Sequence, residues 1–429
     1  TYSIALTGGT FDLSTLPGNF DVSKASNWTN ATVDGNTLTV TGLKTDVTYT
    51  YDLGNGKTAT FTLHPASCTL TESMVEAIPV QSHTGSEVTP DVTLKCGDTI
   101  LQKDIDYTIS YASNIEIGTA KVTITGKGFF TGEITVPFEI GVAIDAKNFP
   151  DETFRTYVKE NIDTTPDDIL TVSELEQVIE IDVSSKKISD LTGVEYFTAL
   201  QRLYCFDNNL TKLDLSQNTA LKELDCSNNN LTELDLSRNT ALKELICSTN
   251  LLKELDVSQN IALDFLNCSG NNLTELDVHQ NTTLQILSCG NNLLRDLDVH
   301  WNTALQELNV SHNNLSELDV RQNTALKTLR CSNNHLAKLD IQQNTELTSL
   351  NCSENMYFID TVNGTFDLST LPDGFDRNKT SDWTNATVDG NTLTVTDLKT
   401  AVIYTYDLGN GEKETFGLIP NSCTLSEEM

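Results

Sequence analysis

The chain has 429 residues, and its 60 acidic and 27 basic side chains give a formal net charge of −33. A surface this negative repels phosphate backbones and anionic lipid headgroups, which argues against nucleic acid and membrane surfaces as partners. No run of apolar residues reaches the roughly 18 needed to span a bilayer. The length suggests two to four domains.

Residues 9–74 recur without a gap as residues 364–429, beginning GTFDLSTLPGNFD and GTFDLSTLPDGFD. Within the unit, runs such as TLTVTGL alternate apolar with polar residues, and Asp34-Gly35 and Asn55-Gly56 are typical of hairpin turns. We therefore predict a small antiparallel β module, present at residues 1–74 and again at 357–429. Because the second copy stops at a repeat boundary, we expect the chain to be part of a larger modular protein.

Residues 75–141 contain further strand-like runs, among them DYTISY and GTAKVTITGKGFFTG. Their order resembles the bacterial immunoglobulin-like modules found along surface proteins of Gram-positive bacteria. The resemblance implies a second all-β module in this segment.

Residues 142–199 change in character, because PDETFRTYVKENI and VSELEQVIEI have helical periodicity. Between them lies a stretch with the twelve-residue shape of an EF-hand calcium loop. Asp168 stands where the sharp turn needs glycine, and Pro166 stiffens the loop, so both an EF-hand relic and a calcium site remain open. The candidate ligands are Asp163, Thr165, Asp167 and Glu174.

A 21-residue unit repeats without insertion from Leu200 to about residue 356, as in LKELDCSNNNLTELDLSRNTA. One such coil cannot bury its apolar face alone, but stacked coils form a continuous core. The units begin at Leu200, Leu221, Leu242, Leu263, Leu284, Leu305, Leu326 and Leu347.

These residues resemble the leucine-rich-repeat family, specifically the bacterial subclass with the nested pattern LxxLxLxxNxLxxLDL. The resemblance implies an α/β leucine-rich-repeat solenoid, residues 200–356, with a helical N-terminal cap at residues 142–199 like that of internalin-like proteins, flanked by all-β, immunoglobulin-like modules. A stack needs covers at both ends. We therefore expect residues 357–429 to close its far end, and the first copy of that module to close a preceding repeat block.

One position of the repeat holds cysteine in seven units and Val310 in the remaining one. Valine there indicates a buried apolar site, so we predict a column of free core cysteines rather than a metal site. Two columns of asparagine, Asn208 to Asn355 and Asn218 to Asn344, are predicted to satisfy buried backbone groups with both halves of their amides. The state of three cysteines outside the repeats stays open: Cys68, Cys96 and Cys423.

Aspartates also align from coil to coil, from Asp214 to Asp340, and like charges on neighbouring strands repel. Hydrogen bonds to the adjacent turn are the favoured offset, and calcium along this edge is the alternative. His279 and His300 share one position of adjacent coils beside Trp301, but two ligands do not make a metal site, and we interpret them as an exposed loop column.

The variable positions beside each buried leucine of the first half-repeat point outward, onto the surface that the resemblance makes concave. Most are polar, but Ile246, Phe265 and Ile286 fall on consecutive coils, which suggests an exposed apolar patch used in binding. Packing of these side chains against the cap, a loop or each other is the alternative. The full set of candidate ligand-binding residues is Tyr204, Phe206, Ile246, Phe265, Ile286, Asn267, Asn309 and Arg330.

No motif of a nucleophile elbow, zinc protease, P-loop or dinucleotide site is present in the sequence, so we expect no enzyme and no obligatory cofactor. The resemblance to internalin-like adhesins implies a secreted or cell-surface protein of a Gram-positive bacterium. It would be a monomer that binds a protein or glycan on a host or neighbouring cell. The alternative is a structural spacer or stalk with no ligand of its own.

Overall fold

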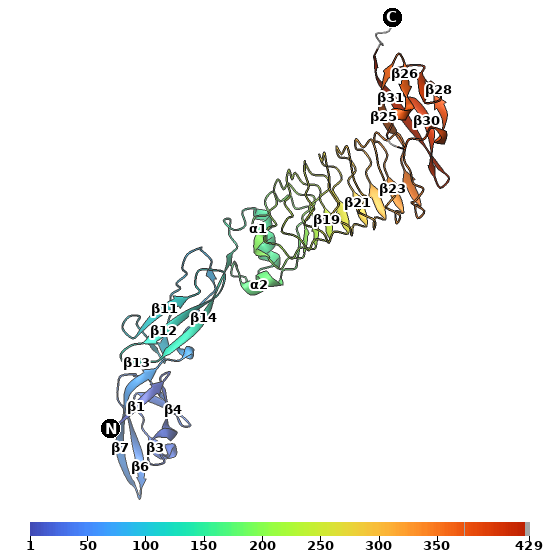
Figure 1. Ribbon diagram of the computed structural model, residues 1–429. Coiled ribbons are helices and arrows are strands. Elements are labelled where there is room, and N and C mark those ends of the chain that lie inside the picture. The colour runs from blue at the N-terminus through green and yellow to red at the C-terminus, as the bar shows by residue number, and fades with distance from the viewer. Residues whose placement is uncertain (373, 425–429) are drawn as a thin grey trace. The chain divides into compact units, whose positions relative to one another are not determined.

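The computed structural model describes residues 1–372 and 374–424 (Figure 1). Contacts divide the chain into two compact units, residues 1–143 with 165–172 and residues 144–164 with 173–429.

The N-terminal module, residues 1–74, is built around one mixed sheet with the strand order β3-β6-β7-β1-β2-β5-β4. The expectation of a purely antiparallel module is wrong in one respect, because β1 pairs with β7 in parallel. These two strands come from opposite ends of the module, so no hairpin fixes them as antiparallel. The strands are β1 (Tyr2–Thr7), β2 (Thr10–Asp12), β3 (Ala25–Ser26), β4 (Ala31–Asp34), β5 (Thr37–Val40), β6 (Val47–Gly54) and β7 (Lys57–Thr69).

The following segment forms a second sheet of order β11-β12-β14-β15, with β8 added in parallel to β14. Phe130 of β13 pairs with Cys68 of β7, so the sheet of the N-terminal module gains a strand from this segment. The strands are β8 (Gln81–Ser82), β9 (Lys95–Cys96), β10 (Thr99–Ile100), β11 (Tyr107–Ala112), β12 (Gly118–Gly126), β13 (Phe130–Thr131), β14 (Glu133–Ala143) and β15 (Ile169–Leu170). Whether the segment is an immunoglobulin-like module stays a prediction.

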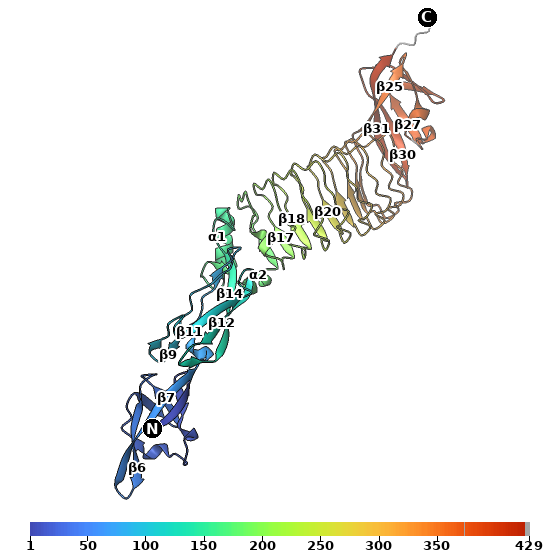
Figure 2. The same cartoon turned by 60° about the vertical axis from the view of Figure 1, so that its left-hand side comes forward.

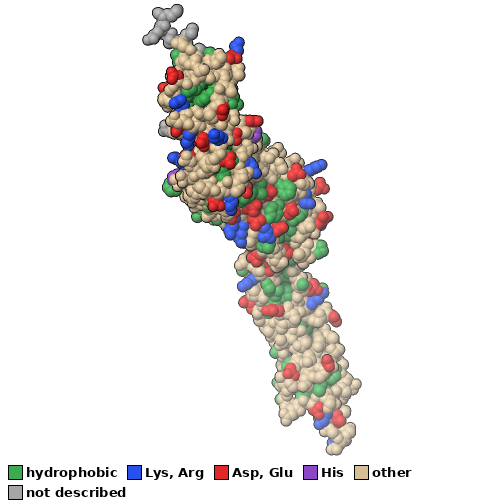
Figure 3. Space-filling view, turned by 90° about the vertical axis from the view of Figure 1, so that its right-hand side faces the viewer, with side chains coloured by type: hydrophobic (Ala, Val, Ile, Leu, Met, Phe, Trp, Pro, Cys, Tyr) green, Lys and Arg blue, Asp and Glu red, His purple; other side chains and the backbone are tan. Residues whose placement is uncertain are grey.

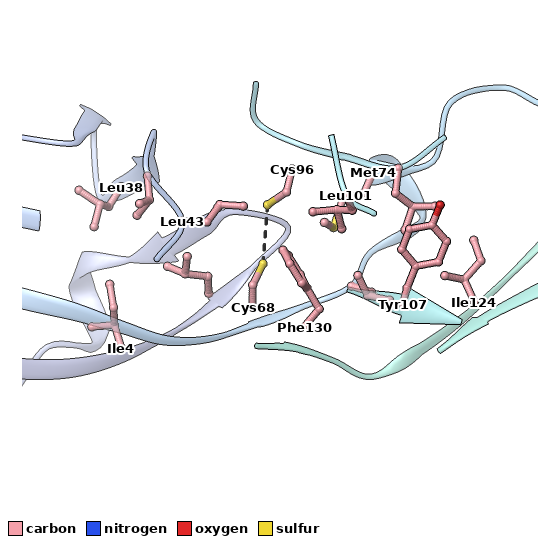
Figure 4. Close-up of a cluster of buried hydrophobic side chains, with 14 of the residues drawn as sticks. Ile4, Leu38, Leu43, Cys68, Met74, Cys96, Leu101, Tyr107, Ile124 and Phe130 are labelled. Carbon is pink, nitrogen blue, oxygen red and sulfur yellow. Dashed lines mark hydrogen bonds between the residues drawn. The ribbon is translucent and has the colours of Figure 1, made fainter. Parts of the chain in front are cut away.

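One hydrophobic core runs through both parts of this unit, and Cys68 and Cys96 meet inside it (Figure 4). Their sulfur atoms lie 3.7 Å apart, and both side chains are buried free thiols. Gly9, with φ of +86°, makes room for this contact, since a Cβ there would lie 2.8 Å from the Cys96 Sγ. The side chain of Cys423, whose state the sequence left open, lies outside the described part of the chain.

The second unit begins with α1 (Glu152–Asn161), whose first turn is capped by the Asp151 carboxylate, which accepts from the Thr153 and Phe154 N–H groups. The shorter α2 spans Val172–Gln177. The helical periodicity of VSELEQVIEI predicted a longer helix, but its last residues form the strand β16 (Glu180–Asp182). β16 pairs with the first strand of the repeats, because an isoleucine there fills the position of a repeat leucine.

The repeats form one parallel nine-stranded sheet in the order of the sequence, β16 to β24 (Figures 1 and 2). Each coil adds one three-residue strand and returns through turns, so within residues 200–356 the solenoid holds no helix. The repeat strands are β17 (Arg202–Tyr204), β18 (Glu223–Asp225), β19 (Glu244–Ile246), β20 (Phe265–Asn267), β21 (Ile286–Ser288), β22 (Glu307–Asn309), β23 (Thr328–Arg330) and β24 (Ser349–Asn351).

Leucines and one cysteine per coil fill the inside of the stack. The cysteine column is free and fully buried, and Val310 continues it with the same burial, as the sequence predicted. Burial raises the pKa of the Cys226 and Cys268 thiols to about 12, so these cysteines behave as small neutral apolar groups at neutral pH.

The first asparagine column uses both halves of its amide, as expected. Asn271, for example, donates through Nδ2 to the carbonyls of Cys247 and Cys268 and accepts at Oδ1 from the Leu252 N–H, each at 3.0 Å. The second column uses only the donor half. Asn281 donates to Val257 and Asn260 at 3.0 and 2.9 Å, while its buried Oδ1 has no hydrogen-bond partner.

The C-terminal module repeats the sheet of the N-terminal one, with the strand order β27-β30-β31-β25-β26-β29-β28. It lies at the end of the repeat stack in both views (Figures 1 and 2). The strands are β25 (Asn355–Val362), β26 (Thr365–Asp367), β27 (Thr380–Thr384), β28 (Ala386–Asp389), β29 (Thr392–Val395), β30 (Val402–Gly409) and β31 (Glu412–Thr424).

Candidate binding face of the repeat sheet

The outward face of the repeat sheet is made by the first and third residues of each strand. The middle residue is a leucine that points inward, and in β17 to β21 the two flanking residues are half-buried. Strict parallel register places equivalent residues of neighbouring coils side by side, so the face consists of two straight columns. The scaffold that fixes these columns is the buried leucine, cysteine and asparagine set.

The three apolar residues of the predicted patch lie on adjacent strands, but not in one column. Phe265 is directly opposite Ile286, whereas Ile246 belongs to the other column and is opposite Asn267. All three are half-buried rather than fully exposed. We call this set, Ile246, Phe265 and Ile286, the apolar patch.

Carboxylates border the patch on the side of the earlier coils. Burial, followed by the charges of Glu223, Asp264 and Asp225, raises the pKa of Glu244, which precedes Phe265 in its column. In the sheet, Glu244 is directly opposite Phe265, Asp225 is opposite Ile246, and Glu223 is opposite Glu244. The patch therefore has an acidic rim.

The aromatic residues near the first coil are tied down by hydrogen bonds. The Tyr204 hydroxyl donates to Glu223 Oε2 at 2.6 Å, and this bond raises the pKa of Tyr204 to about 12. Arg202 binds Glu180 at 2.7 Å. Phe206 follows β17 and is half-buried. This end of the face is a polar network rather than a continuation of the apolar patch.

Two of the predicted polar contact residues have a local structural role. Asn267 Oδ1 accepts from the Ser269 N–H and Asn309 Oδ1 from the Ser311 N–H, both at 3.1 Å, and each bond closes the turn after its strand. Arg330 is exposed in β23, three coils beyond Phe265. Asn267 thus borders the patch, whereas Asn309 and Arg330 lie on later coils.

Four exposed apolar side chains of the repeat block were not among the binding residues that the sequence indicated. Leu251 and Leu293 follow the first asparagine column on alternate coils and are 47% and 48% exposed. The equivalent residue is polar in each of the remaining complete coils. A leucine at a position that is otherwise polar could therefore have indicated these two side chains from the sequence. Ile261 and Trp301 are the other two, at 59% and 57% exposure in the turns between coils.

The aspartate column lies on the second half-repeat and is held by backbone hydrogen bonds, as the favoured explanation required. Asp235, for instance, accepts from the Ser237 N–H at 2.9 Å, and this bond lowers its pKa. Beside the first coils a groove of about 1140 Å³ is lined by a mixture of these aspartates, glutamates, lysines and an arginine. Its charges are mixed, and the leucines that also line it are buried.

The two histidines of the loop column have separate partners. His279 Nδ1 lies 2.6 Å from Asp277 Oδ1, and the His300 ring packs edge-on against Trp301 at 5.1 Å. This arrangement fits an exposed loop column.

The last residue of the EF-hand-like stretch, Glu174, forms hydrogen bonds within that stretch. Glu174 Oε1 accepts from the N–H and the hydroxyl of Thr164, at 2.8 and 2.7 Å. Asp168, with φ of +63°, does adopt the left-handed conformation of the missing glycine.

Of the candidate calcium ligands, Asp163 and Glu174 belong to one compact unit, and Thr165 and Asp167 to the other. Within residues 1–372 and 374–424 no group of three or more His, Cys, Asp or Glu side chains is arranged to hold a metal ion. Calcium binding stays a prediction.

Among the helices of the described chain, none is both long and apolar enough to cross a membrane.

Comparison with known proteins finds bacterial proteins that are similar to part of this chain. Internalin J of Listeria monocytogenes serotype 4b is 44% identical over 71 residues, which are 17% of this chain and 8% of that protein. The functional domain of InlJ from Listeria monocytogenes, described as including a cysteine ladder, is 41% identical, covers 50% of this chain and 51% of that chain, and has a TM-score of 0.48. An internalin C2 from the same species is 22% identical, covers 48% and 96% of the two chains, and has a TM-score of 0.44. No family model matches the chain.

The parallel sheet, the leucine core and the asparagine ladders define a leucine-rich-repeat protein. Over the 71 matched residues its sequence is similar to that of internalin J. The matched part spans only a small fraction of internalin J and about half of the InlJ domain.

Proposed function

We propose that the chain is a secreted or surface-displayed binding protein that recognises another protein through the outward face of its repeat sheet. The observation that carries the proposal is the apolar patch: Phe265 and Ile286 side by side, with Ile246 on the adjacent strand. Apolar side chains that keep part of their surface in water and are bordered by polar ones mark recognition sites.

The acidic rim determines the kind of partner that fits. Glu223, Asp225 and Glu244 lie beside the patch, in a chain whose formal net charge is −33. A protein with an apolar anchor flanked by lysine or arginine would complement both features, and opposite net charges would speed the encounter. Raising the ionic strength should therefore slow association.

The rigid backbone favours recognition without rearrangement. Leu245, Leu266 and Leu287, behind the patch, are fully buried, and the asparagine ladders fix the turns on either side. Preorganised side chains lose little conformational entropy on binding. The face is therefore suited to hold a few anchor residues in place.

The experiment is a screen of the full chain against arrays of purified cell-surface proteins and of glycans, run in parallel with two variants. One variant carries Ile246→Ser, Phe265→Ser and Ile286→Ser, and the control carries Leu251→Ser and Leu293→Ser. We expect protein ligands that are lost with the first variant and retained with the control. Ligands that survive the patch substitutions, in a chain with an unchanged circular dichroism spectrum, would contradict the proposal. Binding to glycans alone, or to nothing, would favour a different recognition mode or a spacer.

A further inference from the structure

The C-terminal module covers the end of the repeat stack with one face of its β30–β31 hairpin. Tyr404, through its hydroxyl, donates to the carbonyl of Ala337, and the Ile341 N–H donates to the Leu408 carbonyl at 3.1 Å. Gly409 packs so closely on Gln342 that an added Cβ would lie 2.4 Å from its Cγ. We call the set Tyr404, Tyr406, Leu408 and Phe416 the aromatic face of this module; each side chain is at most 2% exposed.

One contact shows that this module takes the place of a next coil. Within the stack, the carbonyl before each turn accepts from the second-column asparagine of the following coil, as Val320 does from Asn344 at 2.9 Å. At the last coil the equivalent carbonyl, that of Ile341, accepts from Asn410 Nδ2 at 2.7 Å. The Asn-Gly turn of the module thus supplies the hydrogen bond that a further coil would have made.

The N-terminal module carries the same residues in the same register, 355 positions earlier, but Tyr51 is half-buried there and two of the four are exposed, while Tyr49 stays buried. Leu53 is 57% exposed where Leu408 is buried, and Phe61 is 41% exposed where Phe416 is buried. Tyr49 is retained, and Asn55 keeps the left-handed conformation of Asn410, with φ of 56° and 55°. Hydrophobic side chains are visible on the surface of this module in the lower part of Figure 3.

The exposed face is also hollowed. A pocket of about 310 Å³ is lined by aromatic and aliphatic side chains of the hairpin and of the preceding loop, among them Phe20, Tyr49, Tyr51 and Phe61. Aromatic rings that are this well ordered against one another, such as Tyr49 and Phe61 at 5.7 Å, present a fixed apolar surface. A partner with a complementary apolar end would bury it.

We propose that the aromatic face of the N-terminal module, Tyr49, Tyr51, Leu53 and Phe61 with the Asn55 amide, is a docking face for the last coil of a second leucine-rich-repeat stack that leads directly into β1. The stack of this chain cannot be the occupant, because the C-terminal module already covers its end. β1 runs parallel to β7 as β25 runs parallel to β31, so a coil joined to β1 would arrive at the same side of the hairpin. This proposal is independent of the binding function of the repeat sheet.

The test uses a tandem chain in which residues 1–356 are followed directly by residues 2–429. Met356 of the first part is then joined to Tyr2 of the second, just as it is joined to the equivalent Tyr357 in the natural sequence. The tandem therefore has a leading N-terminal module and an internal one that follows a repeat stack. Leu53→Cys is introduced either in the leading module or in the internal one, and the rate of labelling by a maleimide is measured in the folded protein. We expect the introduced thiol of the internal module to be labelled at least about ten times more slowly than that of the leading one, because docking must open before it reacts.

Leu408→Cys is the matched control and should be labelled slowly at its docked position. Equal labelling rates for Leu53→Cys in the leading and in the internal module would overturn the proposal. A first stack that fails to fold in the tandem would also overturn it, because the same stack is folded where the C-terminal module closes it.

Discussion

Single residues in this protein are informative mainly through the column to which they belong. Val310, within a cysteine column, predicted a buried apolar site, and all described members of that column are buried. The aspartate column likewise predicted backbone hydrogen bonds, and Asp214, Asp235 and Asp256 make them. Glu174 shows the limit of the approach, because a match to a loop motif did not reveal that Thr164 donates twice to this side chain.

The ion pair of Asp319, a member of the aspartate column, can be tested through the pH dependence of stability. Its carboxylate accepts from the Arg321 guanidinium at 2.6 and 2.9 Å, and this bond is the first cause that lowers its pKa from 3.8 to about 2. A lowered pKa in the folded state stabilises the fold above the unfolded pKa, and this contribution is lost as the pH falls through the folded one. The difference in unfolding free energy between the wild type and Asp319→Asn should therefore be constant above about pH 4 and shrink between pH 4 and 2.

Urea denaturation at a series of pH values measures this difference. Because Asp319 is half-exposed, the difference should be small, at most about 1 kcal/mol. A difference that grows as the pH falls would contradict the assignment.

Cys68 and Cys96 lead to a second prediction at this scale. Their sulfur atoms are 3.7 Å apart, and the hydrogen bond between the two thiols lowers the pKa of Cys68 while it raises that of Cys96. Folding in a mixture of reduced and oxidised glutathione should join them, as each thiol gives up one hydrogen and glutathione disulfide is reduced to two thiols. The bond closes a loop of moderate length and should stabilise the first unit by about 3 kcal/mol.

Peptide mapping of the folded chain after alkylation checks this pairing. The expected product is one peptide pair linked through Cys68 and Cys96. A disulfide within the repeat column instead, or alkylation of both Cys68 and Cys96 after complete oxidation of the buffer, would show the prediction to be wrong.

At the scale of elements, a strict period made the repeat strands predictable to the residue. The helices were less predictable than the strands. The pattern of VSELEQVIEI did not show that its end joins the repeat sheet as β16, because pairing with β17 determines the conformation of these residues. The antiparallel expectation for the β modules failed for the same reason, because β1 and β7 meet only through tertiary structure. The apolar patch was predicted by residue, but its acidic rim follows from how Glu244 lies among neighbouring carboxylates.

The two asparagine ladders should differ in their contribution to stability. Asn271→Ala leaves the buried Leu252 N–H without its acceptor. Asn281→Ala removes donors from carbonyls that keep another donor, Asn260 for Val257 and Leu263 for Asn260, and also removes an unpartnered oxygen. We expect Asn271→Ala to lower the unfolding free energy by about 1–3 kcal/mol more than Asn281→Ala.

Chemical denaturation of the two variants in parallel measures the difference. Equal losses would mean that the acceptor half of the first ladder contributes nothing. A larger loss for Asn281→Ala would contradict the hydrogen-bond assignment of both ladders.

At the scale of the whole molecule, the chain combines a repeat stack, a module that closes it, and a homologous module in which the equivalent hairpin exposes Leu53 and Phe61. The repeats carry two kinds of information: inward positions specify the stack, and outward positions vary. The sequence separates the two kinds because only the inward positions must satisfy the same packing in every coil. The partner that the outward positions recognise is a second molecule, whose identity this sequence does not contain. The outward residues indicate only its chemistry, an apolar anchor with basic surroundings.

The central claim is that the apolar patch is the site of recognition, and the dissociation constant of a single-site variant tests it most directly. For a protein ligand identified on the array, isothermal titration calorimetry would compare the wild type with Phe265→Ser and with the matched control Leu293→Ser. We predict that Phe265→Ser raises the dissociation constant at least about ten-fold, the loss of a central anchor, while Leu293→Ser changes it less than about two-fold. An unchanged dissociation constant for a folded Phe265→Ser variant would contradict the claim.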